Sequence, residues 1–492
     1  MKYLLTLDVG TAAVKAALFD EHLKPCALVI QEYTLLTPQT DWVELPAEIY
    51  WDTAVLCIQH VMAESGVPRD EIAAITCTTQ GETLIPITQD GQVLHNAIVW
   101  MDARAKVEAL TVGGQYTKER FYHKTGVPEA SPYTPLCKLI WLKNNLPDVY
   151  LHTHKFLLVE DYLVYRLSGR FVTNPGVLCS SGYFDVLQND LWHEILERNG
   201  LDADKIPGVL PCGSVVAPLC QAAALELGLD KSIFVTTGAM DQVAAAVGIG
   251  NINPGTVNES TGTCLCVAAT VQDPHLDSWS SVAVYSHALP GLYLKVVVTQ
   301  TAGMILKWFR DEFCVDLLGK GDFARMDELA KAEPAGSRDL MLFPYLTGME
   351  SDPAARGVFF GFGLDTSRGC FIRAVMESVG YTLKQNLAQM GLAPECLYSL
   401  GGGARSAVWN QIKANICNTE IRVSETSESA SLGAAMLGGV ACGIFSDLDD
   451  ACLKLHEGDV FSPQLELVAR YKEGYGRFNA MYEYFKPLFV EG

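Results

Sequence analysis

The feature that most constrains the fold of this chain is an apolar run, a Gly-Thr tip and a second apolar run, and it occurs twice. In the first copy the apolar run ends at Asp8, the tip is Gly10–Thr11, and the next run begins near Val14. Two such runs around a short Gly-containing break are typical of a β-hairpin. Residues 257–269 repeat the plan, with Gly262–Thr263 at the tip. Because internal similarity outweighs any single motif, the two copies predict two similar domains.

The first tip carries the groups that a phosphate site needs. A tip at Gly10 turns backbone amides toward one point, and converging amides form a concavity that binds phosphate. Thr11 adds a hydroxyl donor and Lys15 a mobile positive charge. A carboxylate at Asp8 fits beside an anion only with a cation between them, and Mg²⁺ prefers carboxylate, water and phosphate oxygens. The alternative is an ordinary N-terminal hairpin, but the second copy favours two phosphate hairpins facing one nucleotide.

Three motifs together make the pattern of the whole chain recognisable. Asp8-x-Gly-Thr, Thr261-Gly-Thr and Gly401-Gly-Gly-Ala-Arg-Ser resemble the phosphate and adenosine elements of the actin-like ATPase superfamily. Within it, the chain resembles the FGGY carbohydrate kinases, which include glycerol kinase and xylulokinase. The segment from Tyr133 to Asn145 matches the family's first signature at every fixed place. The resemblance runs from residue 3 to about residue 440.

The resemblance implies an α/β protein with two actin-like, ribonuclease H-like ATPase domains around a nucleotide and sugar cleft. A turn is predicted at Asn253-Pro-Gly255, and we place the domain boundary shortly before it, near residue 249. The N-terminal domain, residues 1–248, is expected to bind sugar and phosphate and to carry the catalytic base. The C-terminal domain, residues 249–492, is expected to bind ATP and to end in a helical tail.

The resemblance also implies ATP as the phosphoryl donor and Mg²⁺ as the metal ion. Asp8 is expected to hold Mg²⁺, and Thr11, Lys15 and Thr263 to bind phosphate oxygens. Glycines in the loop at 401–403 allow close approach of the backbone to adenosine or phosphate. The residues implied for the nucleotide are Asp8, Gly10, Thr11, Lys15, Gly262, Thr263, Gly402, Gly403 and Ala404.

Asp241 is the candidate catalytic base. A β-rich run breaks at Gly238 and gives way to an alanine-rich helix, which places Asp241 at the helix N-terminus. One interpretation makes Asp241 an N-cap, and the other makes it the acceptor of a proton from a substrate hydroxyl. The resemblance favours the second, because the family's catalytic aspartate occupies this place in a Gly-x-x-Asp sequence.

Polar side chains follow two apolar runs that are predicted to be strands. A buried strand at 71–79 runs into Gln80–Glu82, and a second strand at 97–100 leads to Asp102 and Arg104. In open α/β sheets, ligands bind beyond the carboxyl ends of strands, so we expect these residues at one sheet edge. For Asp102 and Arg104 the alternative is a surface ion pair. The predicted substrate-binding set is Gln80, Gly81, Glu82, Trp100, Asp102, Arg104 and Asp241.

Comparison with two branches of the family narrows the expected substrate. Glu82 falls on the glycerol-binding glutamate of glycerol kinases, but Gly81 falls on their arginine, and its loss is expected to remove a donor and open space. Xylulokinases carry histidine where Gln80 stands and share the Trp-x-Asp-x-Arg pattern that begins at Trp100. We therefore expect ATP-dependent phosphorylation of a hydroxyl of a small sugar or polyol, with a pentulose or pentitol favoured. A carboxylated sugar is disfavoured unless Arg104 reaches it.

Two alternatives to this function stay open in the sequence. A glycerol kinase-like enzyme acting on a triose or polyol differs only in the acceptor. An actin-like or chaperone-like ATPase has no sugar substrate at all, but it leaves Asp241 beside Gln80, Glu82 and Trp100 unexplained.

Composition limits the partners and the compartment. The hydrophobic content of 49% with 19% charged residues is that of a globular enzyme. The formal net charge of −21 argues against nucleic acid or an anionic membrane as a partner. The 15 cysteines include no Cys-x-x-Cys, and no signal peptide or long apolar span is present, so we expect a cytoplasmic protein. The sequence leaves a homodimer open and does not decide the oligomeric state.

Overall fold

The structure, a computed structural model, describes residues 1–349, 352–424 and 428–489. The chain forms two compact units that alternate along the sequence. Unit 1 comprises Met1–Pro254, Thr270–Lys295 and Glu428–Leu455, and unit 2 comprises Gly255–Ala269, Val296–Ser427 and His456–Gly492. The single functional division near residue 249 stays a prediction.

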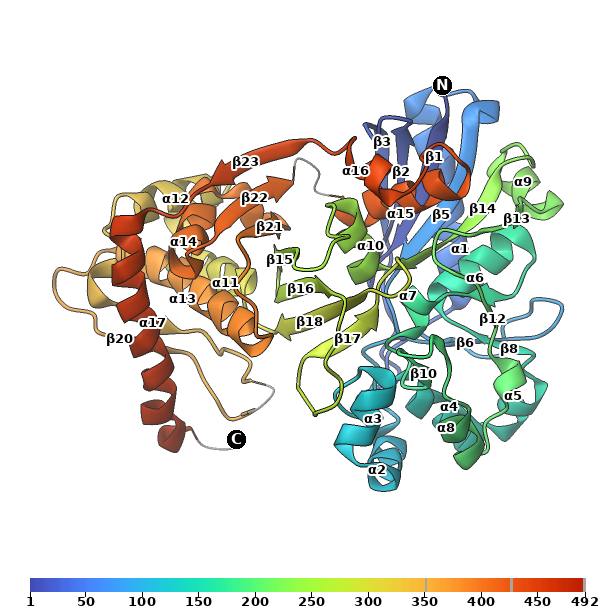
Figure 1. The fold of residues 1–492 in the computed structure, drawn as a ribbon, viewed down its shortest axis with the longest axis horizontal. Coiled ribbons are helices and arrows are strands. Elements are labelled where there is room, and N and C mark those ends of the chain that lie inside the picture. The colour runs from blue at the N-terminus through green and yellow to red at the C-terminus, as the bar shows by residue number, and fades with distance from the viewer. Residues whose placement is uncertain (350–351, 425–427, 490–492) are drawn as a thin grey trace. The chain divides into compact units, whose positions relative to one another are not determined.

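A six-stranded sheet lies at the centre of unit 1, in the order β13-β14-β5-β1-β2-β3 (Figure 1). β1 (Tyr3–Val9) and β2 (Ala13–Asp20) are antiparallel neighbours, which confirms the first predicted hairpin. β5 (Ile72–Thr79) is parallel to β1, and β14 (Phe234–Met240) is parallel to β5. The two edge strands are β3 (Pro25–Glu32) and β13 (Val215–Pro218).

The carboxyl ends of β1, β5 and β14 meet at one edge of this sheet (Figure 1). In register, Val9 of β1 lies opposite Thr79 of β5, and Thr79 lies opposite Met240 of β14. The next residues along β5 and β14 are Gln80 and Asp241. The topology therefore brings three distant parts of the sequence together where α/β sheets bind ligands.

Two helices rich in small residues support this edge. α10 (Asp241–Gly248) packs against α15 (Ser429–Ala441), and α15 also contacts β1, β5 and β14. A Cβ at Gly433 would lie 1.8 Å from the carbonyl oxygen of Ala244, so only glycine permits this approach. The contact fixes α10, which begins with Asp241, against the rest of unit 1.

The core of unit 1 is formed by apolar side chains of the sheet and of α1 (Ala47–Ser65), which packs on β2 and β3. Leu5 and Leu7 of β1 and Ile58 and Val61 of α1 are all fully buried. Burial stabilises each such side chain by roughly 1.5–3 kcal/mol, which keeps the strand ends that carry the polar residues rigid.

Unit 2 is built around the second hairpin. β15 (Val257–Thr261) and β16 (Leu265–Val271) are antiparallel, as predicted, and β15 also pairs in parallel with β21 (Cys396–Leu400). β22 (Glu420–Ser424) and β23 (Glu457–Phe461) continue the sheet beyond β21. Because Ser260 lies opposite Leu400, the tip at 262–263 and the loop at 401–406 are neighbours.

The remaining elements belong to the seven-stranded sheet that contains β15, form small two-stranded sheets, or cover the sheets and connect their strands. The helices are α2 (Lys106–Gln115), α3 (Lys118–Thr125), α4 (Pro135–Asn145), α5 (Pro147–His152), α6 (Val159–Ser168), α7 (Pro175–Leu178), α8 (His193–Arg198), α9 (Gln221–Leu227), α11 (Gly303–Phe313), α12 (Asp322–Lys331), α13 (Arg368–Gln389), α14 (Ala407–Cys417), α16 (Leu448–Cys452) and α17 (Leu465–Phe485). The strands are β4 (Glu44–Leu45), β6 (Ile85–Ile87), β7 (Ala97–Ile98), β8 (Lys155–Leu157), β9 (Val172–Thr173), β10 (Phe184–Asp185), β11 (Asp190–Leu191), β12 (Gly208–Val209), β17 (Ala283–Ser286), β18 (Tyr293–Thr299), β19 (Met341–Phe343) and β20 (Val358–Phe360).

Two features of these helices bear on the predictions. α17 provides the helical tail expected at the C-terminus. Within the described ranges, none of the helices combines the length and the apolar character that crossing a membrane requires.

Candidate active site

Asp241 is aimed by a break at the end of β14. The pairing of β14 with β5 shifts register between Thr236 and Ala239, and a Cβ at Gly238 would lie 1.9 Å from the carbonyl oxygen of Cys77. The Gly238 N–H leaves the ladder and donates to Glu160 Oε1 at 2.8 Å. Such a bulge redirects a strand end. The glycine in the Gly-x-x-Asp sequence is therefore required by close backbone packing.

The N-cap interpretation of Asp241 is wrong, because Met240 occupies the cap position and Asp241 is the first residue of α10. The Asp241 Oδ1 accepts a hydrogen bond from the Gln242 N–H at 2.6 Å. Burial, followed by the nearby charge of Asp8, raises the pKa of Asp241 from 3.8 to about 7, and Glu82 adds to the rise. A carboxylate with a pKa near the working pH is well suited to take a proton from a hydroxyl.

The phosphate hairpin places Asp8 and Lys15 side by side. They are direct partners across β1 and β2, and the Lys15 Nζ lies 3.5 Å from Asp8 Oδ2. The same Nζ lies 2.7 Å from Glu428 Oε2, and the sequence analysis assigned no role to Glu428. Burial raises the pKa of Asp8, while the charge of Lys15 opposes the rise. The Lys15 ammonium group is thus held between the Asp8 and Glu428 carboxylates next to the tip.

At the tip itself, two protein groups that were predicted to bind phosphate already have hydrogen-bond partners. The Gly10 N–H donates to the Ala13 carbonyl at 3.0 Å, which closes the turn. The Thr11 Oγ1 accepts a hydrogen bond from the Trp100 Nε1 at 2.9 Å, so its hydroxyl hydrogen remains able to donate. Gly10 therefore shapes the tip, and its own N–H does not point at a ligand.

Gln80 and Glu82 follow β5 as predicted. The Gln80 N–H donates to the Val9 carbonyl at 2.9 Å, which ties this segment to the end of β1. The Gln80 Nε2 donates to the Tyr50 hydroxyl at 3.1 Å, whereas its buried Oε1 has no hydrogen-bond partner among the described residues. Glu82 has a φ of 56°, a left-handed conformation uncommon outside glycine and typical of functional sites.

The electrostatics of Glu82 also distinguish it from a surface carboxylate. Burial raises its pKa, while a hydrogen bond with Ser180 and the charge of Lys138 lower it. Ser180 was not predicted, and its position among small residues at 179–182 offers no periodic signal. Its hydroxyl can both donate and accept at this edge.

The expectation that Gly81 opens space is wrong. A Cβ at this position would lie 2.6 Å from Met240 Sδ and 3.3 Å from Ser180 Oγ. Met240 comes from the end of β14 and occupies the room that a side chain at position 81 would need. The loss of an arginine donor relative to glycerol kinases stands, but the volume is filled by a thioether.

Trp100 is also near the phosphate hairpin, although the strand before it is shorter than predicted. β7 comprises only Ala97–Ile98 and pairs with β4, outside the six-stranded sheet. The Trp100 backbone N–H donates to Thr83 Oγ1 at 2.9 Å, and its indole reaches Thr11. The Trp100 residue is 36% exposed, so part of it remains accessible to a ligand.

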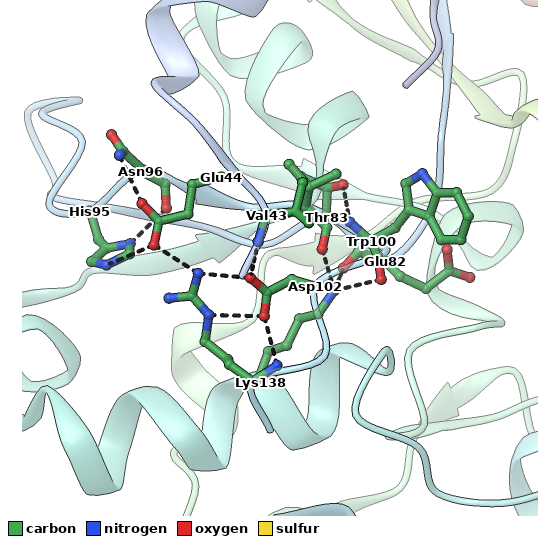
Figure 2. A network of polar contacts seen from close by, with 11 residues as sticks. Val43, Glu44, Glu82, Thr83, His95, Asn96, Trp100, Asp102 and Lys138 are labelled. Carbon is green, nitrogen blue, oxygen red and sulfur yellow. Dashed lines mark hydrogen bonds and ion pairs between the residues drawn. The ribbon is translucent and has the colours of Figure 1, made fainter. Parts of the chain in front are cut away.

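Asp102 and Arg104 form a buried ion pair, so the alternative of a surface ion pair is wrong, while their substrate roles stay a prediction. Figure 2 shows the polar contacts of Asp102. Both side chains are 0% exposed. Asp102 accepts from the Arg104 Nε, Nη2 and backbone N–H at 2.7–2.9 Å and from the Val43 N–H at 2.6 Å. The Arg104 Nη2 also donates to Glu44 at 2.7 Å, and its guanidinium lies 3.8 Å from the ring centroid of Trp42. Within the described residues, the Arg104 Nη1 is buried without a hydrogen-bond partner, whereas its Nε and Nη2 are paired.

In unit 2, the predicted nucleotide residues form two adjoining loops. The N-terminus of α11 packs on the second tip, where the Gly303 N–H donates to the Gly262 carbonyl at 2.8 Å and the Ala302 N–H to the Thr263 carbonyl at 3.1 Å. The side chain of Thr263 is exposed. Both tip residues are thus held by backbone contacts, while the Thr263 residue stays exposed.

The glycine loop of unit 2 is not uniformly open. A Cβ at Gly403 would lie 2.7 Å from Thr261 Cγ2, so this glycine is required by packing, and Ala404 is buried beside it. Gly402 is exposed, and a Cβ there would meet nothing within 4 Å. Of the three predicted residues, Gly402 alone presents an open backbone surface on which a flat base can lie.

Comparison with known proteins accounts for this arrangement. The model of the FGGY family of carbohydrate kinases, N-terminal domain, matches residues 3–248, and that of the C-terminal domain matches residues 257–442. The chain belongs to the FGGY family of carbohydrate kinases. The predicted resemblance and the two-domain α/β fold are confirmed, and family membership excludes the conformational ATPase. This FGGY kinase is a phosphotransferase that uses ATP to phosphorylate an alcohol group of a small sugar or polyol.

Individual relatives of this FGGY kinase act on different acceptors. It is 26% identical to the xylulose kinase of Bacillus subtilis over 99% of this chain and 98% of that protein. It is 26% identical to the autoinducer-2 kinase of Enterobacter sp. strain 638 over 91% of this chain and 88% of that protein. The crystal structure of the gluconate kinase from Lactobacillus acidophilus superimposes with a TM-score of 0.89 at 25% identity, covering 99% of each chain.

Proposed function

We propose that this FGGY kinase phosphorylates an open-chain five-carbon ketose or polyol, with Asp241 as the general base. The observation that carries the proposal is the cluster of hydrogen-bond acceptors at one sheet edge of unit 1. The Gln80 Oε1 is buried and has no hydrogen-bond partner in the part of the chain that the structure describes. Glu82 follows it in a strained backbone conformation, and Asp241 begins the helix after β14. Acceptors gathered in this way suit a ligand that offers several hydroxyl hydrogens.

Asp241 supplies the acid–base chemistry in this proposal. The acceptor hydroxyl donates its hydrogen to the Asp241 carboxylate, its oxygen bonds to the γ-phosphorus of ATP, and the bond from that phosphorus to the β-γ bridging oxygen breaks to release ADP. Little covalent chemistry is needed from the protein, so in-line positioning and charge neutralisation dominate. A pKa of about 7 lets Asp241 accept the proton at neutral pH and release it after product leaves.

The phosphate end of the site is assigned to the first hairpin. Lys15 is a positive point charge for phosphate oxygens, and the Thr11 hydroxyl retains its hydrogen for donation. The donor set also fits Mg²⁺, because Asp8 places a carboxylate beside the anion-binding tip and this ion usually takes one or two protein carboxylates and completes its shell with water and phosphate. When bound, the ion neutralises charge that develops on the transferred phosphoryl group. In unit 2, Thr263 and Gly402 are assigned to the nucleotide.

The negative charge at this sheet edge argues against an acidic sugar as the acceptor. Glu82, Asp241 and Asp8 all repel a carboxylate, and Arg104, which the sequence left as a compensating cation, is buried in its own ion pairs. Lys15 is assigned to phosphate, and the Lys138 ammonium group donates to backbone carbonyls, so among the described residues neither cation is assigned to a gluconate-type carboxylate. The carboxylates at this edge therefore favour a neutral acceptor such as a ketopentose.

A panel assay of acceptors tests the proposal. ADP release is measured with D-xylulose, D-ribulose, xylitol, D-arabitol, glycerol and D-gluconate, and kcat/KM is compared. We expect at least one five-carbon neutral acceptor to exceed glycerol and gluconate by about tenfold or more, since a site built to bind hydroxyls strongly rejects analogues that lack them. Glycerol or gluconate with the highest kcat/KM would contradict the proposed substrate class.

A further inference from the structure

Lys138 is a buried cation that none of the preceding roles uses. It lies in α4 within the segment that matches the family signature, and its side chain is fully buried. Its Nζ donates to the carbonyl oxygens of Glu82 at 3.0 Å, Val99 at 2.9 Å and Trp100 at 3.2 Å (Figure 2). An ammonium group has three N–H donors, so each has one acceptor.

This arrangement is unusual for a lysine. Burying a charge is costly unless it is paired, and the partners here are three neutral carbonyls. Burial accordingly lowers the pKa of Lys138 to about 7, although Glu82 and Asp102 oppose the shift. Simple packing would be better served by an apolar side chain of the same length. The cost indicates that the three carbonyls need to be held.

The three carbonyls belong to the two segments that present Glu82 and Trp100. Glu82 is in the left-handed region, and the two segments also meet through the Trp100 N–H and Thr83 Oγ1. The Trp100 indole in turn donates to Thr11 at the phosphate tip. One ammonium group therefore links the segment that follows β5, the segment that follows β7 and, through Trp100, the hairpin at β1 and β2.

We infer that Lys138 is a positioning residue that holds Glu82 and Trp100 in the arrangement that binds the sugar. The role in sugar binding rests on the proposed function, whereas the role in holding the two segments does not. Within the described ranges, the hydrogen bonds of the Lys138 ammonium group all go to backbone oxygens, so it acts through the residues that it fixes. A displacement of about 1 Å at a reacting group can lower the rate by about a hundredfold. The gain from holding Glu82 and Trp100 in place can therefore exceed the cost of burying the lysine.

The helix that carries Lys138 has a second lysine that provides a matched control. The Lys143 Nζ donates to the carbonyl oxygens of Asn199 at 3.0 Å and Gly200 at 2.6 Å. Both lysines thus donate to backbone carbonyls from α4, but Lys143 serves a loop that carries none of the proposed site residues. Lys143→Met should therefore report the general effect of removing such a lysine from this helix.

The first test needs no ligand. Hydrogen–deuterium exchange followed by mass spectrometry is measured on the full-length Lys138→Met, Lys138→Gln and Lys143→Met variants. We expect Lys138→Met to accelerate exchange by about tenfold or more in peptides covering 80–84 and 98–102, because local opening depends on local contacts. Lys138→Gln, which keeps two N–H donors, should show a smaller increase. Lys143→Met should leave both peptides unchanged.

The second test uses kinetics with the best acceptor of the panel. Lys138→Met should raise the KM for that acceptor by about tenfold or more, while the KM for ATP changes less than about threefold and Lys143→Met stays within about twofold of wild type in both. An acceptor panel without any active sugar would contradict the proposed function and leave the exchange result to decide the clamp.

Several outcomes would overturn the inference about Lys138. Unchanged exchange at 80–84 and 98–102 in Lys138→Met would show that the carbonyls are held without it. Acceleration spread evenly over all of unit 1 would assign Lys138 to global stability. Failure of both Lys138 variants to fold, with Lys143→Met folded, would assign it to global stability as well.

Discussion

Replacement of Asp241 by asparagine tests the proposed base most directly. Asparagine has nearly the same size and keeps an oxygen that can accept from the Gln242 N–H, so the start of α10 should be preserved. The amide cannot take a proton from the acceptor hydroxyl. Positioned bases contribute about 10²–10⁴-fold, so we expect kcat to fall by at least about a hundredfold, equivalent to roughly 2.7 kcal/mol in the barrier.

The structure also predicts the pH dependence of the wild type. With a pKa of about 7 for Asp241, kcat/KM should rise with pH and level off above about pH 8. The residual activity of the Asp241→Asn variant should show no such rise, because the group that titrates is gone. ADP release over pH 5.5–9 at subsaturating acceptor concentration measures both profiles.

The same pKa has a consequence for stability. A folded-state pKa raised from 3.8 to about 7 means that ionisation of Asp241 is opposed by the fold, so stability declines as pH rises from about 4 to 7. The full effect is on the order of 4 kcal/mol. Asp241→Asn removes this unfavourable ionisation, so the variant should be more stable than wild type at pH 8. At pH 5 the gain in stability should be much smaller.

Two results would refute this reasoning. Retention of more than about a tenth of wild-type kcat by Asp241→Asn would exclude the base assignment. A stability gain measured by urea unfolding that is the same at pH 5 and pH 8 would show that Asp241 is not held against ionisation by burial and by Asp8.

Further predictions concern the metal, the phosphate and the buried network. Asp8→Ala should abolish Mg²⁺-dependent turnover, and normal activity over a Mg²⁺ titration would place the ion elsewhere. Lys15→Ala should weaken ATP binding by ~1.5–3 kcal/mol in calorimetry, as expected for a lost charge-assisted contact, and unchanged affinity would remove Lys15 from the site. Asp102→Asn should destabilise the fold in urea by up to about 3–5 kcal/mol, because it removes one of the two carboxylates that pair with the buried Arg104. The acceptor KM of the folded enzyme should stay near wild type. A large change in that KM with normal stability would support the substrate role.

Much of this protein could be predicted from local sequence patterns. The two hairpins, the buried strand predicted at 71–79 and the start of α10 at Asp241 all follow from short apolar runs that end at glycine or polar residues. Hydrogen-bonded turns and strand periodicity are local properties, so the chain itself records them. The family resemblance added the base and the donor, because those roles are attached to short motifs.

Other features depended on contacts between residues far apart in the sequence. Asp102 and Arg104 look like exposed polar residues after a strand, but Glu44, Val43 and Trp42 bury them. The lack of a side chain at Gly81 predicts open space, yet the side chain of Met240, from a strand about 160 residues later, occupies it. No periodicity within either segment carries this information.

The sequence by itself determined the residues that can do chemistry, namely a carboxylate after an apolar strand, a Gly-Thr tip and an aspartate at a helix start. The tertiary structure alone decided which of them remain available to a ligand. Burial and pairing consume hydrogen-bonding groups, and they depend on which strands become neighbours. The parallel pairing of β1, β5 and β14 brings Asp8, Gln80 and Asp241 to one edge, where burial and then the charge of Asp8 raise the pKa of Asp241. That coupling acts through space, so no reading of either segment alone contains it.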